Sequence, residues 1–162
     1  MEAYLGIDVG SVTTKFAVLN KEHELVTDLY LQTQGKPIDM VQEGLKQVQQ
    51  RLSKDVDIRG VATTGSARYL AGVIVGADLV KNEITSHAVA ALKYVPQVQT
   101  VIEIGGQDSK IIIIRDGVVT DFGMNTVCAA GTGSFLDHQA LRLNMSIEEF
   151  ARRALDSRSP VH

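Results

Sequence analysis

Two short segments of the chain each place a carboxylate seven residues before a lysine. The first runs from Asp8 to Lys15 and the second from Glu103 to Lys110, and both carry a glycine two residues after the carboxylate. Glycine lacks the Cβ that would block a close backbone approach, so successive N–H groups can converge on anionic oxygens. Each segment is therefore a candidate phosphate-binding loop.

The first segment also carries hydroxyl and ammonium donors for phosphate oxygens. Asp8 follows an apolar run, and a carboxylate at a strand end can hold Mg²⁺ through water, because Mg²⁺ keeps several of its waters. The candidate nucleotide-binding residues of this segment are Gly10, Ser11, Thr13, Thr14 and Lys15.

The second segment supplies candidates for the chemistry of phosphoryl transfer. Glu103 and Asp108 are candidate acidic groups beside Asp8, and Gln107 is a candidate for orienting an attacking water. Asp8, Gln107 and Glu103 are thus the candidate catalytic residues. The candidate nucleotide-binding residues here are Gly105, Gly106, Gln107 and Asp108.

The two segments belong to an internal repeat. A shift of 95 residues superimposes residues 8–15 on residues 103–110 without a gap, and the apolar flanks match as well. Self-similarity of this kind indicates a duplicated domain. The alternative is chance similarity between two strand–turn–strand units.

The pattern of apolar residues predicts an α/β chain with mixed strands and helices. Alternation and β-branched runs predict strands, and apolar residues at three- and four-residue steps predict helices. The predicted strands are 4–9, 16–19, 23–31, 56–63, 100–104, 111–114 and 118–122, and the predicted helices are 38–52, 80–94, 133–143 and 147–155.

The second copy of the repeat stops earlier than the first. The first copy continues with a further strand and helix after its first long helix, whereas the chain ends before the matching strand of the second. We therefore expect a first domain over residues 1–98 and an incomplete second domain over residues 99–162.

Composition excludes several classes of function. A hydrophobic fraction of 44% with 22% charged residues is typical of a globular protein, and a net charge of −3 without a basic stripe argues against a nucleic-acid partner. No apolar stretch approaches the length of a membrane span, and no signal-peptide pattern opens the chain. The single cysteine, Cys128, fits a reducing compartment. We expect a cytoplasmic protein.

Five segments together resemble a known family. Residues 6–15 and 101–110 look like the two phosphate motifs of the actin, Hsp70 and sugar-kinase superfamily, whose domains have the ribonuclease H-like fold. Residues 82–88, 105–108 and 125–137 resemble one branch closely. That branch is the activator (component A) of 2-hydroxyacyl-CoA dehydratases, with the related ATPase subunits of benzoyl-CoA reductase.

The resemblance implies a cofactor set and partners. ATP, with Mg²⁺, binds between two duplicated domains, and hydrolysis drives a low-potential electron from a [4Fe–4S] cluster, shared across a homodimer, to a dehydratase or reductase. Ferredoxin or flavodoxin serves as the electron donor. Carried over to this chain, the cluster ligand is Cys128, and Gly131, Thr132 and Gly133 lie near the nucleotide.

This chain departs from the family pattern in its cysteine content. A [4Fe–4S] cluster needs four thiolates, and one cysteine per chain gives a homodimer two. The family's second cysteine is expected beyond residue 162, and the chain alone is expected to bind ATP weakly. Cys128 precedes a predicted helix N-terminus, which stabilises a thiolate. The alternative is a buried, inert cysteine.

Three functions compete on this basis. The first is the electron-transfer activator, the second is a sugar kinase-like phosphotransferase of the same fold, and the third is a non-catalytic binding remnant. The segment around Cys128 favours the first over the second, and intact Asp8, Lys15, Gln107 and Asp108 argue against the third.

Overall fold

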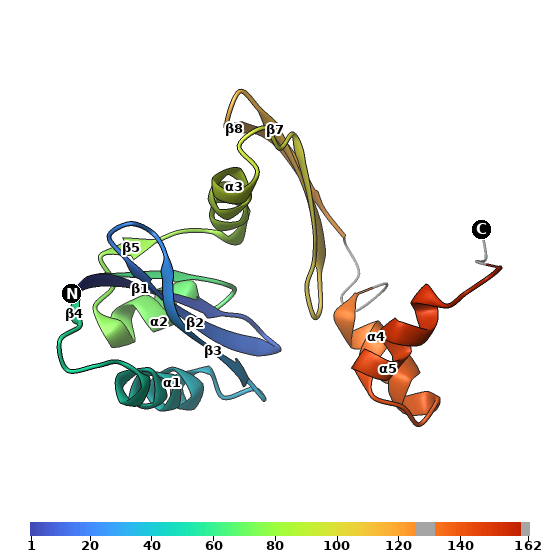
Figure 1. Ribbon diagram of the computed structural model, residues 1–162, viewed down its shortest axis with the longest axis horizontal. Coiled ribbons are helices and arrows are strands. Elements are labelled where there is room, and N and C mark those ends of the chain that lie inside the picture. The colour runs from blue at the N-terminus through green and yellow to red at the C-terminus, as the bar shows by residue number, and fades with distance from the viewer. Residues whose placement is uncertain (126–131, 160–162) are drawn as a thin grey trace. The chain divides into compact units, whose positions relative to one another are not determined.

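The computed structural model describes residues 1–125 and 132–159 (Figure 1). By contact density the chain divides into two compact units. The first contains Met1–Val101 and Ile112–Phe122, and the second contains Ile102–Ile111 and the chain from Gly123 onwards. Cys128 and Gly131 lie outside the described residues.

A five-stranded mixed sheet forms the body of the first unit, in the order β3-β2-β1-β4-β5. β1 pairs antiparallel with β2 and parallel with β4, β2 pairs antiparallel with β3, and β4 pairs parallel with β5. The strands are β1 (Glu2–Val9), β2 (Thr13–Asn20), β3 (Leu25–Gln32), β4 (Asp57–Thr64) and β5 (Leu79–Val80).

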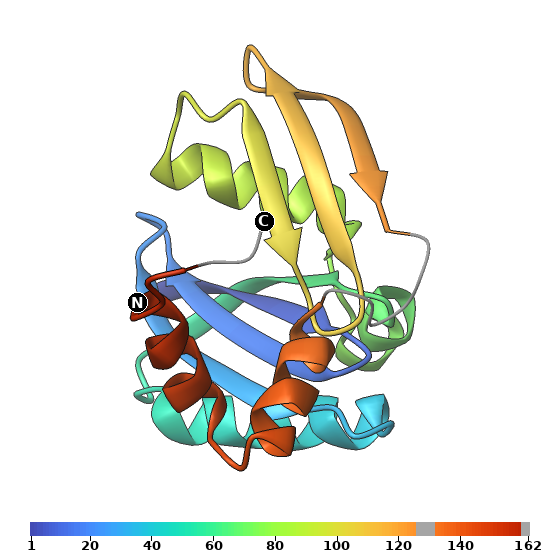
Figure 2. The same cartoon turned by 90° about the vertical axis from the view of Figure 1, so that its right-hand side faces the viewer.

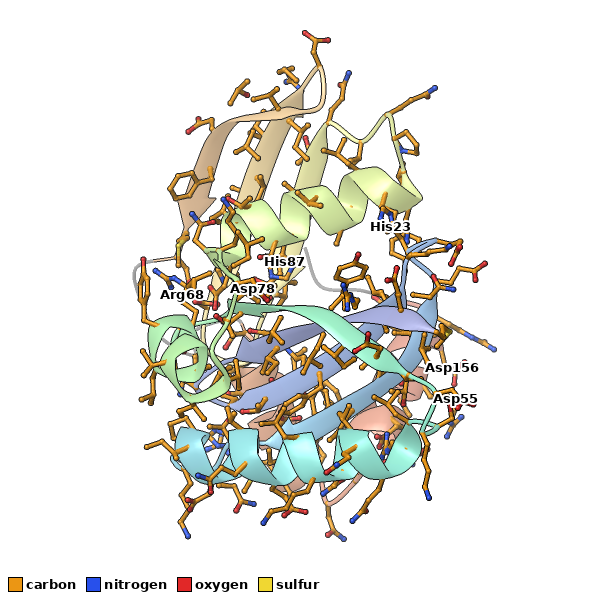
Figure 3. All side chains as sticks on the ribbon, turned by 90° about the vertical axis from the view of Figure 1, so that its left-hand side faces the viewer. His23, Asp55, Arg68, Asp78, His87 and Asp156 are labelled. Atoms are coloured by element: carbon orange, nitrogen blue, oxygen red, sulfur yellow. The ribbon has the colours of Figure 1, made fainter. Side chains whose placement is uncertain are left out.

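Two helices cover one face of this sheet. α1 (Pro37–Arg51) contacts β2 and β3, and α2 (Arg68–Val75) contacts β1 and β4 (Figure 3). Alternate side chains of β1 and β2 point into the core between sheet and helices, as their strand periodicity requires. The buried core consists of Ala3, Leu5, Ile7, Val9, Phe16, Val18, Leu29, Val41, Val48 and Ala71.

A second, three-stranded sheet has the order β6-β7-β8, and its consecutive strands run in opposite directions (Figure 2). Within the first unit, α3 (Glu83–Tyr94) packs on this sheet through Ala88, which is buried with Ile112 and Ile114. The strands are β6 (Thr100–Ile104), β7 (Ser109–Arg115) and β8 (Val118–Met124).

The second unit carries two contacting helices, α4 (Gly133–Arg142) and α5 (Ile147–Leu155). Ser146 caps α5 by accepting a hydrogen bond from the Glu149 N–H. The Glu149 carboxylate accepts hydrogen bonds from Arg152 and Arg153, which lower the pKa of Glu149 below its usual value.

Two predicted element boundaries are wrong, and one helix was not predicted. The predicted helix 80–94 begins only at Glu83, because Leu79–Val80 pairs with β4 as β5 and Asn82 caps the helix by accepting from the Thr85 N–H at 2.8 Å. No pattern in the sequence predicted α2, which occupies Arg68–Val75. The predicted strand 23–31 begins at Leu25, because His23 sits in the turn with φ 64°.

Candidate functional site

The first candidate loop, residues 10–12, joins the carboxyl end of β1 to the start of β2. The Gly10 N–H donates to the Thr13 carbonyl at 2.9 Å and closes the turn. Among the described residues, none accepts a hydrogen bond from the backbone N–H of Ser11 or of Val12. These two amides are therefore available to an anionic ligand.

Asp8 and Lys15 lie beside this loop as register partners on β1 and β2. The Lys15 Nζ lies 2.9 Å from the Asp8 Oδ2, and the two side chains are 47% and 29% exposed, so solvent reaches both charges. The Lys15 ammonium also lies 6.0 Å from the centre of the Tyr30 ring. The carboxylate is thus placed at a strand end where water can reach it.

A turn after β4 encloses the end of β1 next to Asp8. Gly65 is buried with φ +93°, and a Cβ there would meet the Asp8 Oδ1 at 2.6 Å and overlap the Val9 carbonyl. The Ala67 N–H donates to that carbonyl at 3.0 Å. Only glycine fits this position, because of both the backbone conformation and the missing space.

The first turn of α3 reaches the same strand end. Thr64 is the register partner of Asp8 on β4, and the Ser86 Oγ is hydrogen-bonded to the Thr64 Oγ1 at 3.1 Å. Arg68 begins α2 at this end, donates to the Gly65 carbonyl at 3.1 Å and stacks on Tyr69 (Figure 3). Sequence reasoning assigned no role to the turn at residues 65–68, which the structure places against Asp8.

The second candidate loop, residues 105–108, joins β6 to β7 in the second unit. The Gly105 N–H donates to the Asp108 carbonyl at 2.8 Å. Within residues 1–125 and 132–159, no hydrogen bond is made by the N–H of Gly106 or of Gln107, and the Gln107 side chain is exposed. This loop therefore also presents open amides.

The carboxylates of the second loop converge on one buried ammonium. The Lys110 Nζ lies 3.0 Å from the Glu103 Oε2 and 2.6 Å from the Asp108 Oδ1. The Lys110 side chain is only 3% exposed, whereas those of Glu103 and Asp108 are 20% and 39% exposed. Two carboxylates thus share one lysine at the base of the loop.

The N-terminus of α4 holds the second loop from its carbonyl side. The N–H groups of Gly133 and Ser134 donate to the carbonyls of Gly105 and Gly106 at 2.9 and 3.0 Å, and the buried Thr132 hydroxyl donates to the Gly106 carbonyl at 3.0 Å. The structure therefore brings the predicted Thr132 and Gly133 to the predicted loop. Ser134 was missed, because nothing in the sequence pairs it with residue 106.

The architecture and the comparisons with known proteins define the class. The fold is ribonuclease H-like, as in actin-like ATPases, and the solved component A of (R)-2-hydroxyglutaryl-CoA dehydratase from Acidaminococcus fermentans matches 99% of this chain with a TM-score of 0.81 and 35% identity. The activator of 2-hydroxyisocaproyl-CoA dehydratase from Clostridium difficile, solved with bound ADPNP, matches 98% of the chain with a TM-score of 0.82 and 30% identity.

The chain belongs to the BadF/BadG/BcrA/BcrD ATPase family, whose model matches residues 5–161. It is 37% identical over 97% of its length to the (R)-2-hydroxyglutaryl-CoA dehydratase activating ATPase of Acidaminococcus fermentans, covering 60% of that protein. It is 37% identical over 91% of its length to the activator of lactoyl-CoA dehydratase of Anaerotignum propionicum, covering 56% of it. The chain thus spans 56–61% of the length of these relatives and solved structures.

The family assignment confirms the resemblance inferred from the sequence, and the structural matches confirm the fold. Among the described residues, no helix is long and apolar enough to cross a membrane. The roles of the individual site residues remain predictions.

Proposed function

We propose that this chain is the nucleotide-binding part of an ATPase that activates a CoA-ester dehydratase or reductase. The observation that carries the proposal is the recurrence of one turn, in which a glycine N–H closes a hairpin and the next two amides have no acceptor among the described residues. Similarity to dehydratase activators, one of them solved with an ATP analogue, supports a nucleoside triphosphate as the ligand.

Each hairpin contributes amide donors to phosphate oxygens in this proposal. The Ser11 and Val12 amides act in the first loop, and the Gly106 and Gln107 amides act in the second. A cluster of N–H groups at a glycine turn binds anions without needing a basic side chain. The exposed Lys15 ammonium adds positive charge to the first loop.

Asp8 fits the magnesium ion that such a nucleotide carries. Its carboxylate ends a strand, is partly exposed and is held by one lysine, so it can accept a hydrogen bond from a water of hydrated Mg²⁺. Gln107, exposed at the tip of its loop, is the side chain we propose to orient the attacking water. Glu103 is paired with Lys110, and we propose it as the second acidic group of the catalytic site, alongside Asp8.

The chain's own cysteine content does not fit a complete [4Fe–4S] cluster. Cys128 is the single cysteine, and four thiolates are needed. A cluster shared across a homodimer therefore needs thiolate ligands from outside this chain. We propose that electron transfer runs through such a cluster. Activation of a 2-hydroxyacyl-CoA dehydratase or benzoyl-CoA reductase-type partner, with ferredoxin or flavodoxin as donor, belongs to the same proposal.

Titration of the 162-residue chain with MgATP tests nucleotide binding directly. We expect amide resonances of Ser11, Val12, Gly106 and Gln107 to shift in NMR spectra, with slow release of inorganic phosphate. Asp8→Asn should remove the dependence of binding on Mg²⁺. Asp28→Asn is the matched control, because Asp28 is exposed on β3.

Two outcomes would contradict the proposal. Unshifted loop amides at millimolar MgATP would show that the hairpins do not bind phosphate. Transfer of the γ-phosphoryl group to a sugar hydroxyl, with no dependence on a dehydratase, would instead identify the sugar kinase-like alternative.

A further inference from the structure

Behind the first loop lie two buried hydroxyl groups, that of Thr33 and that of Thr14, which the sequence predicts to be a nucleotide ligand. Thr14 is 0% exposed and Thr33, the first residue after β3, is 2% exposed. Their Oγ1 atoms lie 3.0 Å apart, and the Thr33 Oγ1 also lies 2.9 Å from the Gly10 carbonyl oxygen. The three groups form a chain that leads from the core to the loop.

The direction of the protons in this chain follows from simple counting. A threonine hydroxyl has one hydrogen to donate and two lone pairs that accept. The Gly10 carbonyl can only accept, so Thr33 donates to it. Thr14 must therefore donate to Thr33, which leaves the Thr14 hydroxyl proton committed inside the protein and unavailable to a nucleotide.

These bonds also set the direction of the loop amides. A peptide unit is planar and trans, so its C=O and N–H point in opposite directions. The bond from Thr33 to the Gly10 carbonyl thus fixes the direction of the Ser11 N–H, which points the opposite way within the same peptide plane. The Thr33 N–H also donates to the Val12 carbonyl at 2.8 Å and so ties the end of the loop to the same residue.

We propose that Thr33 and Thr14 are positioning residues that hold the first loop with its amides directed outward for phosphate. Thr14 then acts on the loop from the core and not as a phosphate ligand. The identity of the ligand rests on the proposed function. The hydrogen bonds that hold the loop are made within the protein and do not need a ligand. Because both hydroxyls are buried, a group that loses its partner cannot form a hydrogen bond to water instead, so breaking either bond is costly.

Thr33→Val removes the hydroxyl while keeping the shape of the side chain, and it tests the lock in two ways. In the unliganded chain, we expect the Gly10 amide, which donates to the Thr13 carbonyl, to exchange with solvent about tenfold faster, since the Gly10 carbonyl loses its donor and the turn loses a restraint. In a titration, we expect MgATP to bind about tenfold more weakly. Thr33→Ser retains the hydroxyl and should restore both values.

Thr14→Val and the double variant sharpen the test. Alone, Thr14→Val removes one donor and should have a smaller effect than Thr33→Val. Added to Thr33→Val it should do no further harm, because it removes the hydroxyl that Thr33→Val left without a partner. Thr100→Val, on the exposed first residue of β6, is the matched control and should change neither measurement.

The outcomes separate this proposal from the proposed function. If Thr33→Val exchanges and binds MgATP as the parent does, or loosens the amide without weakening binding, the positioning role is overturned. If the parent binds no nucleotide, the proposed function fails. Unchanged exchange of the Gly10 amide in Thr33→Val would then also overturn the lock, and a tenfold increase would support it.

Discussion

The two glycine hairpins share a backbone turn and differ in how they treat their charges. In each, a glycine N–H closes the turn on the carbonyl three residues later, at 2.9 Å in the first and 2.8 Å in the second. In the first, one exposed lysine meets one carboxylate; in the second, one buried lysine meets two. The shift of 95 residues that aligns the sequences also aligns the two turns.

This difference separates the roles of two lysines that the sequence makes equivalent. Lys15 is half exposed, so its ammonium can turn to a ligand. Lys110 is enclosed and committed to Glu103 and Asp108, so it organises its hairpin from within. A repeated residue type at a repeated spacing thus serves two functions, because burial decides what a charge can reach.

The residue that follows the third strand locks each hairpin, but by different chemistry. Thr33 follows β3 and holds the first loop through its hydroxyl and its N–H. Asn125 follows β8, accepts from the Ser109 N–H at 2.9 Å and donates its own N–H to the Ser109 carbonyl at 3.1 Å. The two residues occupy the same place after the third strand of their sheet regions, but they differ in side chain.

The largest expected difference between the hairpins is in stability. Lys110→Met leaves two carboxylates without their buried partner, and we expect the free energy of unfolding to fall by about 3 kcal/mol. Lys15→Met removes a solvent-screened pair and should cost less than about 1 kcal/mol. Urea denaturation followed by circular dichroism measures both, and equal losses would contradict the contrast in burial.

A smaller difference is expected when each turn glycine is replaced by alanine. A Cβ at Gly105 would lie 3.1 Å from a carboxylate oxygen of both Glu103 and Asp108, which Lys110 holds in place, whereas a Cβ at Gly10 would meet only the Thr13 carbonyl at 3.1 Å. We expect Gly105→Ala to lower stability by about 2 kcal/mol and Gly10→Ala by about half of that. Thermal melting compares the two, and a larger effect of Gly10→Ala would show that the carboxylates give way.

The smallest difference concerns salt. A double-mutant cycle on Asp8 and Lys15 should give a coupling of about 0.5 kcal/mol at low ionic strength, because the pair is exposed. In 1 M NaCl the Debye length falls to about 3 Å and this coupling should vanish. The cycle on Glu103 and Lys110 should barely change, and a parallel loss would place Lys110 in contact with solvent.

Local patterns in the sequence were sufficient to predict most of the elements and both hairpins. The steps of three and four residues after Pro37 correspond to α1, and the apolar restart at Thr100 corresponds to β6. α2 was not predicted because its apolar run is short and contains a glycine. Ala71 and Gly72 are buried there by packing, which no local pattern records.

The residues that support the site could not be predicted, because their contacts join distant parts of the chain. Thr33 lies 23 residues from Gly10 in sequence, and Asn125 lies 16 residues from Ser109. Gly65 has a positive φ of +93°, and the need for glycine there is visible only once the end of β1 packs against it. Sequence spacing therefore predicts the loops themselves, and the fold alone shows what restrains them.

The unequal burial of the two lysines allows chemical labelling to report on nucleotide binding and on unfolding separately. Amine-acylating reagents modify lysines that water can reach, so Lys15 should acquire the label while Lys110 stays unmodified in the folded chain. A nucleotide seated on the first hairpin would shield Lys15, and mass spectrometry of a single peptide would then follow occupancy of that hairpin alone. Labelling of Lys110 would register unfolding instead, so one reagent distinguishes a filled loop from a lost fold.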